Sequence, residues 1–152
     1  MKALLGACTN SRDVFLVALL ATTGLRRGEA LGVRLSDLHF LPASTVLGCP
    51  LEGPHLHVVP RENSNKSRVK NDRPRSVPVT SGLVGLYERY RFERDRNPNA
   101  RDCDFLFVNL YRAPYGEAMK LVLRRPDGDD ALLAHADDRG HAVDILGQAL
   151  DV

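Results

Sequence analysis

The clearest hydrophobic pattern in the chain is an uninterrupted apolar run over residues 14–21. A run of this length predicts a buried helix, whose N-cap is expected at Asn10 or Ser11. Gly24 predicts the end of this helix, because glycine readily adopts the left-handed conformation that terminates helices. A second helix is expected over about residues 27–33.

The middle of the chain changes to a pattern with a period of two. Residues 55–59 alternate and are rich in β-forming side chains, so they predict a strand. Residues 75–79 predict the returning strand, and Pro78 places it at a sheet edge or a strand end. The polar stretch 61–72 between them is expected to form an exposed hairpin loop, and a further short strand is predicted at residues 44–47.

The second half of the chain predicts one more long helix, from Ser81 to about Arg96. Its buried face is expected to carry Leu83, Leu86, Tyr87 and Tyr90. Its solvated face is expected to carry Arg89, Arg91, Arg94 and Arg96. Residues 105–108 predict a short buried strand or extended piece, and residues 114–123 predict a further helix. Together these patterns indicate an α+β domain, mostly helical with a small antiparallel β-sheet.

The distribution of charge divides the chain into two parts. A length of 152 residues corresponds to one domain, and the net charge of +2 does not by itself indicate a nucleic-acid partner. The hairpin loop, however, gathers Lys66, Arg68, Lys70, Arg73 and Arg75. Acidic residues gather instead at the C-terminal end. We therefore expect a folded part over residues 1–125 and a divergent acidic tail over residues 126–152.

Cysteine usage and hydropathy indicate the compartment. The three cysteines, Cys8, Cys49 and Cys103, are odd in number and far apart, so they do not form a disulfide framework. This favours a cytoplasmic protein. The apolar run is too short to span a membrane and no targeting segment is recognisable, so no membrane partner is expected.

The position with the most distinctive chemistry is Arg26, just after the predicted helix end at Gly24. An arginine placed where a buried helix stops is held rigidly and is always charged, which suits it to grip a phosphate with two parallel hydrogen bonds. Glu29 lies one helical turn later and can brace the guanidinium. The plainer alternative is a surface arginine paired with a glutamate between two helices, and this stretch alone leaves both open.

The stretch around Arg26 resembles the first signature box of the tyrosine recombinases, the phage-integrase family, which reads T-G-L-R-x-x-E-x-x-x-L-x-x-x-D. The matching residues are Thr23, Gly24, Leu25, Arg26, Glu29, Val33 and Asp37, with Val33 in place of the usual leucine. The resemblance implies that Arg26 is the catalytic arginine that binds the scissile phosphate. It covers about residues 8–119, the first half of a catalytic domain. It also implies double-stranded DNA as the partner and no cofactor, neither metal nor nucleotide.

The predicted hairpin resembles a second feature of the same family, a hairpin of the form K-x-x-x-x-R-x-V-P. The matching residues are Lys70, Arg75, Val77 and Pro78. The resemblance implies that Lys70 is the catalytic lysine, which protonates the 5′-hydroxyl leaving group; Lys66 is the weaker candidate. The DNA-binding residues would be Lys66, Arg68, Arg73 and Arg75. Without the resemblance, the same segment is typical of a solvated basic loop.

The remaining chemistry of the family has no match in this sequence. It requires an H-x-x-R box and then a nucleophilic tyrosine, whereas His135 and Arg139 are one residue too far apart and Tyr115 is the last tyrosine. The resemblance therefore implies site-specific DNA recombination or integration through a phosphotyrosyl intermediate, by a truncated or degenerate copy that is inactive alone. The alternative is a catalytically dead DNA-binding remnant, or an interaction module of an intact recombinase subunit.

Two histidines and a cysteine in the middle of the chain raise the question of a metal site. His55 and His57 share one face of a predicted strand, and Cys49 lies near them in a segment, residues 48–53, that resembles an insertion between the arginine box and the hairpin. A zinc site would require four ligands at sharper spacing. Strand polarity and ordinary loop packing are therefore the preferred interpretation, and no metal is expected.

Overall fold

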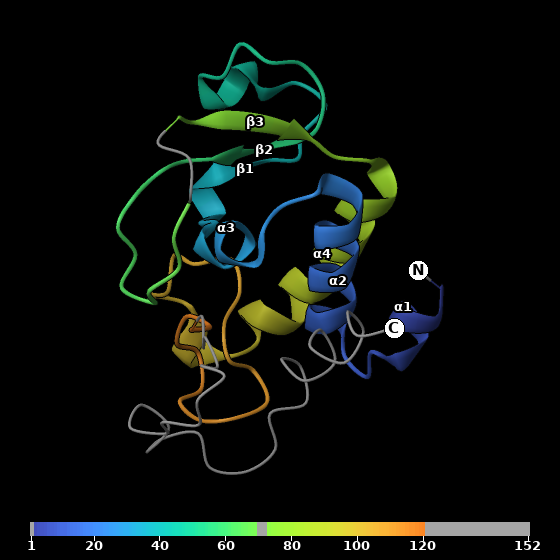
Figure 1. Cartoon of the computed structure of the whole chain (residues 1–152), viewed down its shortest axis with the longest axis vertical. Coiled ribbons are helices and arrows are strands. Elements are labelled where there is room, and N and C mark those ends of the chain that lie inside the picture. Colours follow the sequence, from blue (N-terminus) through green and yellow to red (C-terminus); the bar gives the residue numbers. More distant parts are fainter. Residues whose placement is uncertain (1, 70–72, 121–152) are drawn as a thin grey trace, which may run out of the picture. The chain divides into compact units, whose positions relative to one another are not determined.

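The structure is a computed structural model that describes residues 2–69 and 73–120 (Figure 1). Lys70 lies outside the described residues. So do the acidic tail, the expected boundary between residues 125 and 126, and the pair His135 and Arg139. The described part contains both helices and an antiparallel sheet, which confirms the α+β class.

The two N-terminal helices around Gly24 are formed as predicted. A short helix α1 (Lys2–Ala7) precedes α2 (Ser11–Thr23), and α3 spans Arg27–Gly32. The N-cap of α2 is Asn10, whose side chain accepts a hydrogen bond of 2.9 Å from the backbone N–H of Asp13. Gly24 ends α2 with φ 66°, a left-handed conformation that favours glycine.

The sheet has three short antiparallel strands in the order β1-β2-β3. They are β1 (Leu38–His39), β2 (His55–Val58) and β3 (Arg75–Pro78). The predictions of β2 and β3 are confirmed, whereas β1 was not predicted. The strand expected at residues 44–47 is wrong: Ser44–Leu47 forms a 3-10 turn, η2. The backbone N–H groups of Gly48 and Cys49 bond to the carbonyls of Thr45 and Ser44, which closes this segment into a local turn that ends at Gly48 in a left-handed conformation.

Helix α4 (Ser81–Asp95) follows the sheet and packs against α2 (Figure 1). Its N-cap is Thr80, one residue before the predicted Ser81. The predicted buried face is confirmed for Leu83 and Tyr90, which are almost fully buried. The prediction for Arg94 is wrong, because its guanidinium is buried and donates hydrogen bonds to the carbonyl oxygens of Cys103 and Phe105. These bonds tie the end of α4 to the segment that follows the 3-10 turn η3 (Pro98–Ala100).

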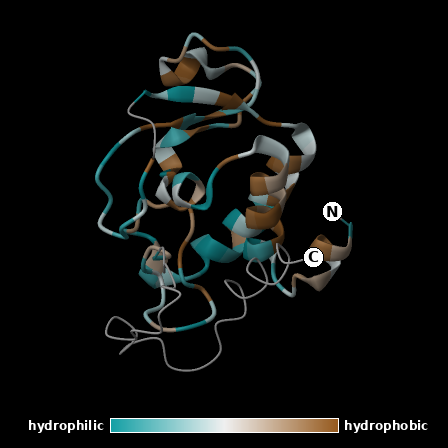
Figure 2. Cartoon of the chain, viewed as in Figure 1, coloured by the Kyte–Doolittle hydropathy of each residue, from teal (hydrophilic) through white to brown (hydrophobic). Residues whose placement is uncertain are grey.

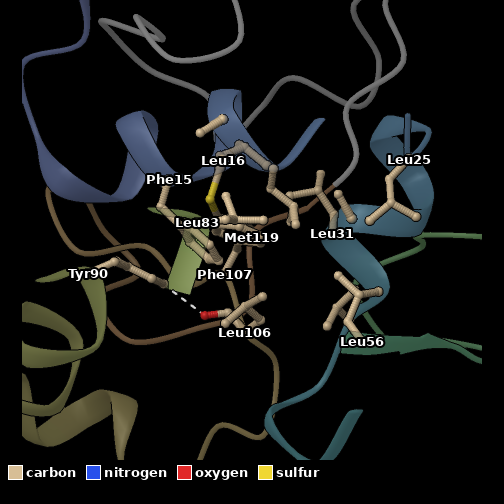
Figure 3. Close-up of a cluster of buried hydrophobic side chains, with 14 of the residues drawn as sticks. Phe15, Leu16, Leu25, Leu31, Leu56, Leu83, Tyr90, Leu106, Phe107 and Met119 are labelled. Atoms are coloured by element: carbon tan, nitrogen blue, oxygen red, sulfur yellow. Dashed lines mark hydrogen bonds between the residues drawn. The ribbon is translucent and has the colours of Figure 1, made fainter. Parts of the chain in front are cut away.

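The hydrophobic core lies between α2, α3, α4, β2 and the segment 105–108. Phe15 stacks on Tyr90 and Phe107 with ring centroids 5.9 and 5.5 Å apart. The hydroxyl of Tyr90 donates to the carbonyl of Leu106 at 2.8 Å (Figure 3). Figure 2 shows the apolar residues concentrated on α2, whereas the C-terminal half of α4 is hydrophilic.

The segment after η3 is extended and pairs through isolated bridges. Phe105 pairs with Arg34, and Val108 pairs with Ala118. This confirms the expected buried extended piece at residues 105–108. The helix expected to begin at Pro114 is wrong for the described residues 114–120, which form turns and an extended return to Val108.

Candidate nucleic-acid interface

Arg26 stands at the start of α3 with its side chain toward solvent. Its guanidinium group is exposed, with a side-chain accessibility of 59%, while Glu29 beside it has only 1%. The backbone N–H of Arg26 donates to Glu29 Oε2 at 2.9 Å, whereas the ionic contact between Arg26 Nη1 and Glu29 Oε1 is longer, at 3.7 Å. Glu29 therefore fixes the backbone of Arg26 more firmly than its guanidinium. The guanidinium remains accessible at the turn between α2 and α3.

Glu29 forms its strongest contact with the hairpin. Both terminal nitrogens of Arg75, the first residue of β3, donate to the Glu29 carboxylate at 3.0 and 2.9 Å. Burial of the Glu29 carboxyl raises its pKa, but the hydrogen bonds from Arg75 and from the Arg26 backbone outweigh burial, so the pKa lies below its ordinary value. Correspondingly, the bond to Glu29 raises the pKa of Arg75. Glu29 is expected from the sequence to brace the guanidinium of Arg26, but its two-point bond is made with the guanidinium of Arg75.

A second bidentate pair joins the same two regions. Asp37, the last residue of the arginine box, is buried and accepts hydrogen bonds from Arg61 at 3.0 and 2.8 Å. Arg61 follows the end of β2 and Arg75 begins β3, so a box carboxylate is bound on each side of the hairpin loop. Arg61 was not predicted from the sequence. A usable signal was the presence of two box carboxylates and several hairpin arginines, because the two groups can pair in a planar fork geometry.

The loop between β2 and β3 is anchored, which corrects the expectation of a fully exposed loop. Asn65 and Ser67 are buried. The Asn65 side-chain amide donates to the carbonyls of Leu31 and Met119, both at 2.9 Å, and its oxygen accepts from Ser67. The loop approaches α3 closely at Gly32, where a Cβ would lie 3.0 Å from side-chain atoms of both Asn63 and Ser67.

Lys66 lies between these two anchors and is exposed. Its φ of 63° is uncommon for a residue with a side chain, and the buried neighbours on both sides maintain it. Arg68 and Arg73 are exposed as well. Arg75 differs from these three because its guanidinium is already bound to Glu29. Of the predicted DNA-binding residues, Lys66, Arg68 and Arg73 thus present accessible cations.

The four tyrosines occupy structural or surface positions. Tyr90 is fully buried and burial raises its pKa to about 12, while burial also raises the pKa of the half-buried Tyr87. Tyr111 donates its hydroxyl proton to the carboxylate of Glu93. Burial, followed by the bond to Glu93, raises the pKa of Tyr111. Tyr115 is half exposed.

Three histidines and one cysteine converge on the sheet. The ligand-type atoms of His39, Cys49, His55 and His57 all lie within 4.8 Å of one another. Burial, and then the charges of His39 and His55, lower the pKa of His57, although Asp37 opposes this shift. The sequence pattern gave these residues no shared role, because His39 is distant from the others along the chain. No metal is expected from the sequence, and the fourth ligand-type side chain that its spacing does not supply is His39.

The chain is similar to a known transposase. It is 26% identical over 121 residues to transposase A from transposon Tn554 of Staphylococcus aureus, and the same figures hold for the proteins of strains Mu50 and N315. The match covers 79% of this chain, and the chain spans about 30% of the length of these curated relatives. No family model and no solved structure matches the chain significantly. Among the described residues, no helix is long and apolar enough to cross a membrane.

Proposed function

We propose that this chain is part of a DNA recombinase of the tyrosine-recombinase kind, acting in transposition or site-specific integration. The observation that carries the proposal is the link through Glu29, which bonds the backbone of Arg26 on one side and the guanidinium of Arg75 on the other. The two sequence features with a family resemblance, the arginine box and the hairpin, thus meet at one buried carboxylate. The similarity to transposase A supports the same class of reaction.

In this proposal Arg26 binds the scissile phosphate. Its guanidinium is exposed, and the Glu29 carboxylate beside it is already engaged by Arg75. Two guanidinium groups around one carboxylate leave a net positive charge at this edge of the molecule. A fixed positive charge of this kind stabilises the charge that develops on a phosphoryl group during transfer.

The hairpin supplies the second part of the proposed chemistry. Lys70, by the family resemblance, protonates the 5′-hydroxyl that leaves when the phosphodiester is broken. The exposed cations Lys66, Arg68 and Arg73 on the same hairpin bind neighbouring phosphates of the duplex. The anchored Asn65 and Ser67 hold the backbone on which Lys66 stands.

The sequence has no tyrosine at the place where the family has its nucleophile, because Tyr115 is the last tyrosine. Tyr90 and Tyr111 are committed to hydrogen bonds within the domain. We propose that the tyrosine and the second phosphate-binding arginine come from another segment of a longer polypeptide or from an intact recombinase subunit. The alternative, a DNA-binding remnant without catalysis, is favoured by the same placement of the tyrosines.

The experiment that tests the proposal is a salt titration of binding to double-stranded DNA, measured by fluorescence anisotropy. The affinity should fall with salt, and the logarithmic slope should shrink by about 0.9 for each DNA phosphate that the protein no longer neutralises. A triple alanine variant of Lys66, Arg68 and Arg73 should therefore flatten the slope.

A charge-matched control is available on α4 and after η3. A triple alanine variant of the exposed Arg89, Arg96 and Arg101 removes the same charge from other elements. It should leave the slope close to that of the unmodified chain. Equal effects of the two triple variants, or the absence of DNA binding at low salt, would contradict the proposed interface.

A further inference from the structure

The sheet brings three histidines onto one face. In β2 the side chains alternate, so Leu56 and Val58 enter the hydrophobic core while His55 and His57 lie on the opposite face. The antiparallel register places His39 of β1 directly opposite His55. The three imidazole rings consequently meet edge to face, with centroids between 4.6 and 5.0 Å apart.

The segment between β1 and β2, residues 40–54, adds a cysteine to these rings. It contains the turn η2, and Gly48 reverses the chain with φ 74°, so that Cys49 N–H bonds to the carbonyl of Ser44 at 3.2 Å. Cys49 is buried, and its sulfur lies 3.4 Å from Nε2 of His55 and 3.6 Å from Nε2 of His57. Figure 1 shows this segment with its short helical turn next to the strands.

Three of the six distances between the ligand atoms agree with a tetrahedral metal site, and the other three are at most 4.8 Å. Bonds of about 2.3 Å to sulfur and about 2.0–2.1 Å to nitrogen define a tetrahedron whose edges are about 3.6 Å from sulfur to nitrogen and about 3.4 Å between nitrogens. The two sulfur–nitrogen distances are 3.4 and 3.6 Å, and Nε2 of His57 lies 3.4 Å from Nδ1 of His39. One cysteine with three histidines is a donor set that suits zinc.

In His55 and His57, the ring nitrogen that faces away from the cluster has a hydrogen-bond partner of the kind that metal-bound histidines have. Nδ1 of His55 bonds to the carbonyl of Gly53 at 2.8 Å. A carbonyl only accepts, so Nδ1 carries the proton and Nε2 directs its lone pair at the cluster. Nδ1 of His57 lies 3.1 Å from the hydroxyl of Ser76, its direct partner in β3. Such partners orient a histidine ligand toward its metal.

Beyond Phe40, which packs against Tyr87 and the core, the segment 40–54 has few other contacts that would hold it in place. In residues 41–54, Ser44 and Cys49 are the two buried residues. The large apolar side chains Leu41, Val46, Leu47 and Leu51 are instead 43–77% exposed. Burial of hydrophobic side chains therefore contributes little to the position of this segment, and a bond through Cys49 would contribute much.

We propose that His39, Cys49, His55 and His57 form a structural zinc site that fastens the segment 40–54 to the sheet. The ligand atoms are Nδ1 of His39, Sγ of Cys49 and Nε2 of both His55 and His57. Four protein ligands leave no position for water or substrate, so the site is structural and not catalytic. On binding, the thiol of Cys49 loses its proton and coordinates as the thiolate.

The test uses the full 152-residue chain and measures metal directly. Purified protein should contain about one zinc ion per chain by mass spectrometry, and zinc added back after chelation should raise the melting temperature. Cobalt(II), substituted for zinc, should produce the near-ultraviolet charge-transfer band of a thiolate ligand. Cys49→Ser should weaken the affinity for zinc by more than about 100-fold, a larger effect than removal of an outer partner causes.

Two further variants separate a metal site from a mere hydrogen-bonded cluster. Cys103→Ser, a control at a half-exposed cysteine outside the cluster, should bind zinc and cobalt like the unmodified chain. Ser76→Ala should weaken zinc binding about 10-fold, because it removes the outer partner of His57. The proposal would be overturned if the unmodified chain contained no zinc, gained no stability from added zinc and showed no cobalt–thiolate band. That result does not depend on whether Cys49→Ser folds, nor on DNA binding.

Discussion

The carboxylate of Glu29 and the guanidinium of Arg75 form a two-point ion pair between residues 46 positions apart in sequence. Glu29 is buried, and the same carboxylate also accepts the backbone N–H of Arg26. The start of α3 and the start of β3 are thereby held together. The proposed roles of Arg26 in phosphate binding and of the hairpin in DNA binding require such a fixed relation, because positioned charge loses its effect when it moves.

Replacing Glu29 by glutamine should destabilise the domain. The amide keeps the shape of the side chain, but its nitrogen cannot accept a hydrogen bond and its charge is gone. The expected decrease is about 1–3 kcal/mol in the free energy of unfolding, measured by urea denaturation. Glu88→Gln on the exposed face of α4 is the matched control and should change stability by less than about 0.5 kcal/mol. Equal decreases in the two variants would show that the pair with Arg75 contributes nothing.

The same pair predicts a pH dependence. The pKa of Glu29 is lower in the folded chain than the value of about 4.3 for a free glutamate. Its contribution is therefore fully present above the unfolded pKa and disappears as the pH falls through the folded pKa. The difference in unfolding free energy between the unmodified chain and Glu29→Gln should stay constant at neutral pH and shrink in acid. A difference that grows as the pH falls would contradict the assigned direction of the pKa shift.

Arg26→Lys should weaken DNA binding without unfolding the domain. The Arg26 side chain is 59% exposed and its ionic contact with Glu29 is long, at 3.7 Å, so its contribution to stability should be below about 1 kcal/mol. Lysine keeps the charge but cannot bind a phosphate with two parallel hydrogen bonds. Binding to double-stranded DNA should weaken, while Arg27→Lys, also at an exposed position, serves as the control. Unfolding of Arg26→Lys would assign this residue a structural role instead.

The chain by itself should form no covalent bond with DNA. A nucleophile must lie in line with the phosphate, and removal of one member of such a constellation costs orders of magnitude in rate. Tyr90 is buried, and the hydroxyl of Tyr111 donates to Glu93. The measurement is a nicked suicide substrate incubated with the protein and analysed on a denaturing gel.

The control for this gel is the same reaction with an intact recombinase added. A protein–DNA adduct formed by the chain alone, and abolished by Tyr115→Phe or by another single tyrosine-to-phenylalanine change, would overturn the prediction. An adduct that requires the added recombinase would indicate that the tyrosine is supplied by a neighbouring subunit.

Signals along the sequence were sufficient to predict α2, β2 and β3, although not every local element. The apolar run of α2, its cap at Asn10 and its end at Gly24 depend on neighbouring residues only, and so does the alternation in β2. Such signals act within a few positions along the chain, through helix capping and through the two- and 3.6-residue periods. The α+β class follows from these elements.

The partners of the candidate site residues follow from how the elements of the fold pack, and the sequence does not show them. Arg75 reaches Glu29, and His39 meets His55, because the register of the sheet and the return of the loops bring distant residues together. The burial of Arg94 depends likewise on where the segment after α4 turns back. A pattern of side chains along the chain carries no information about such distances, since each contact depends on how several elements pack at once.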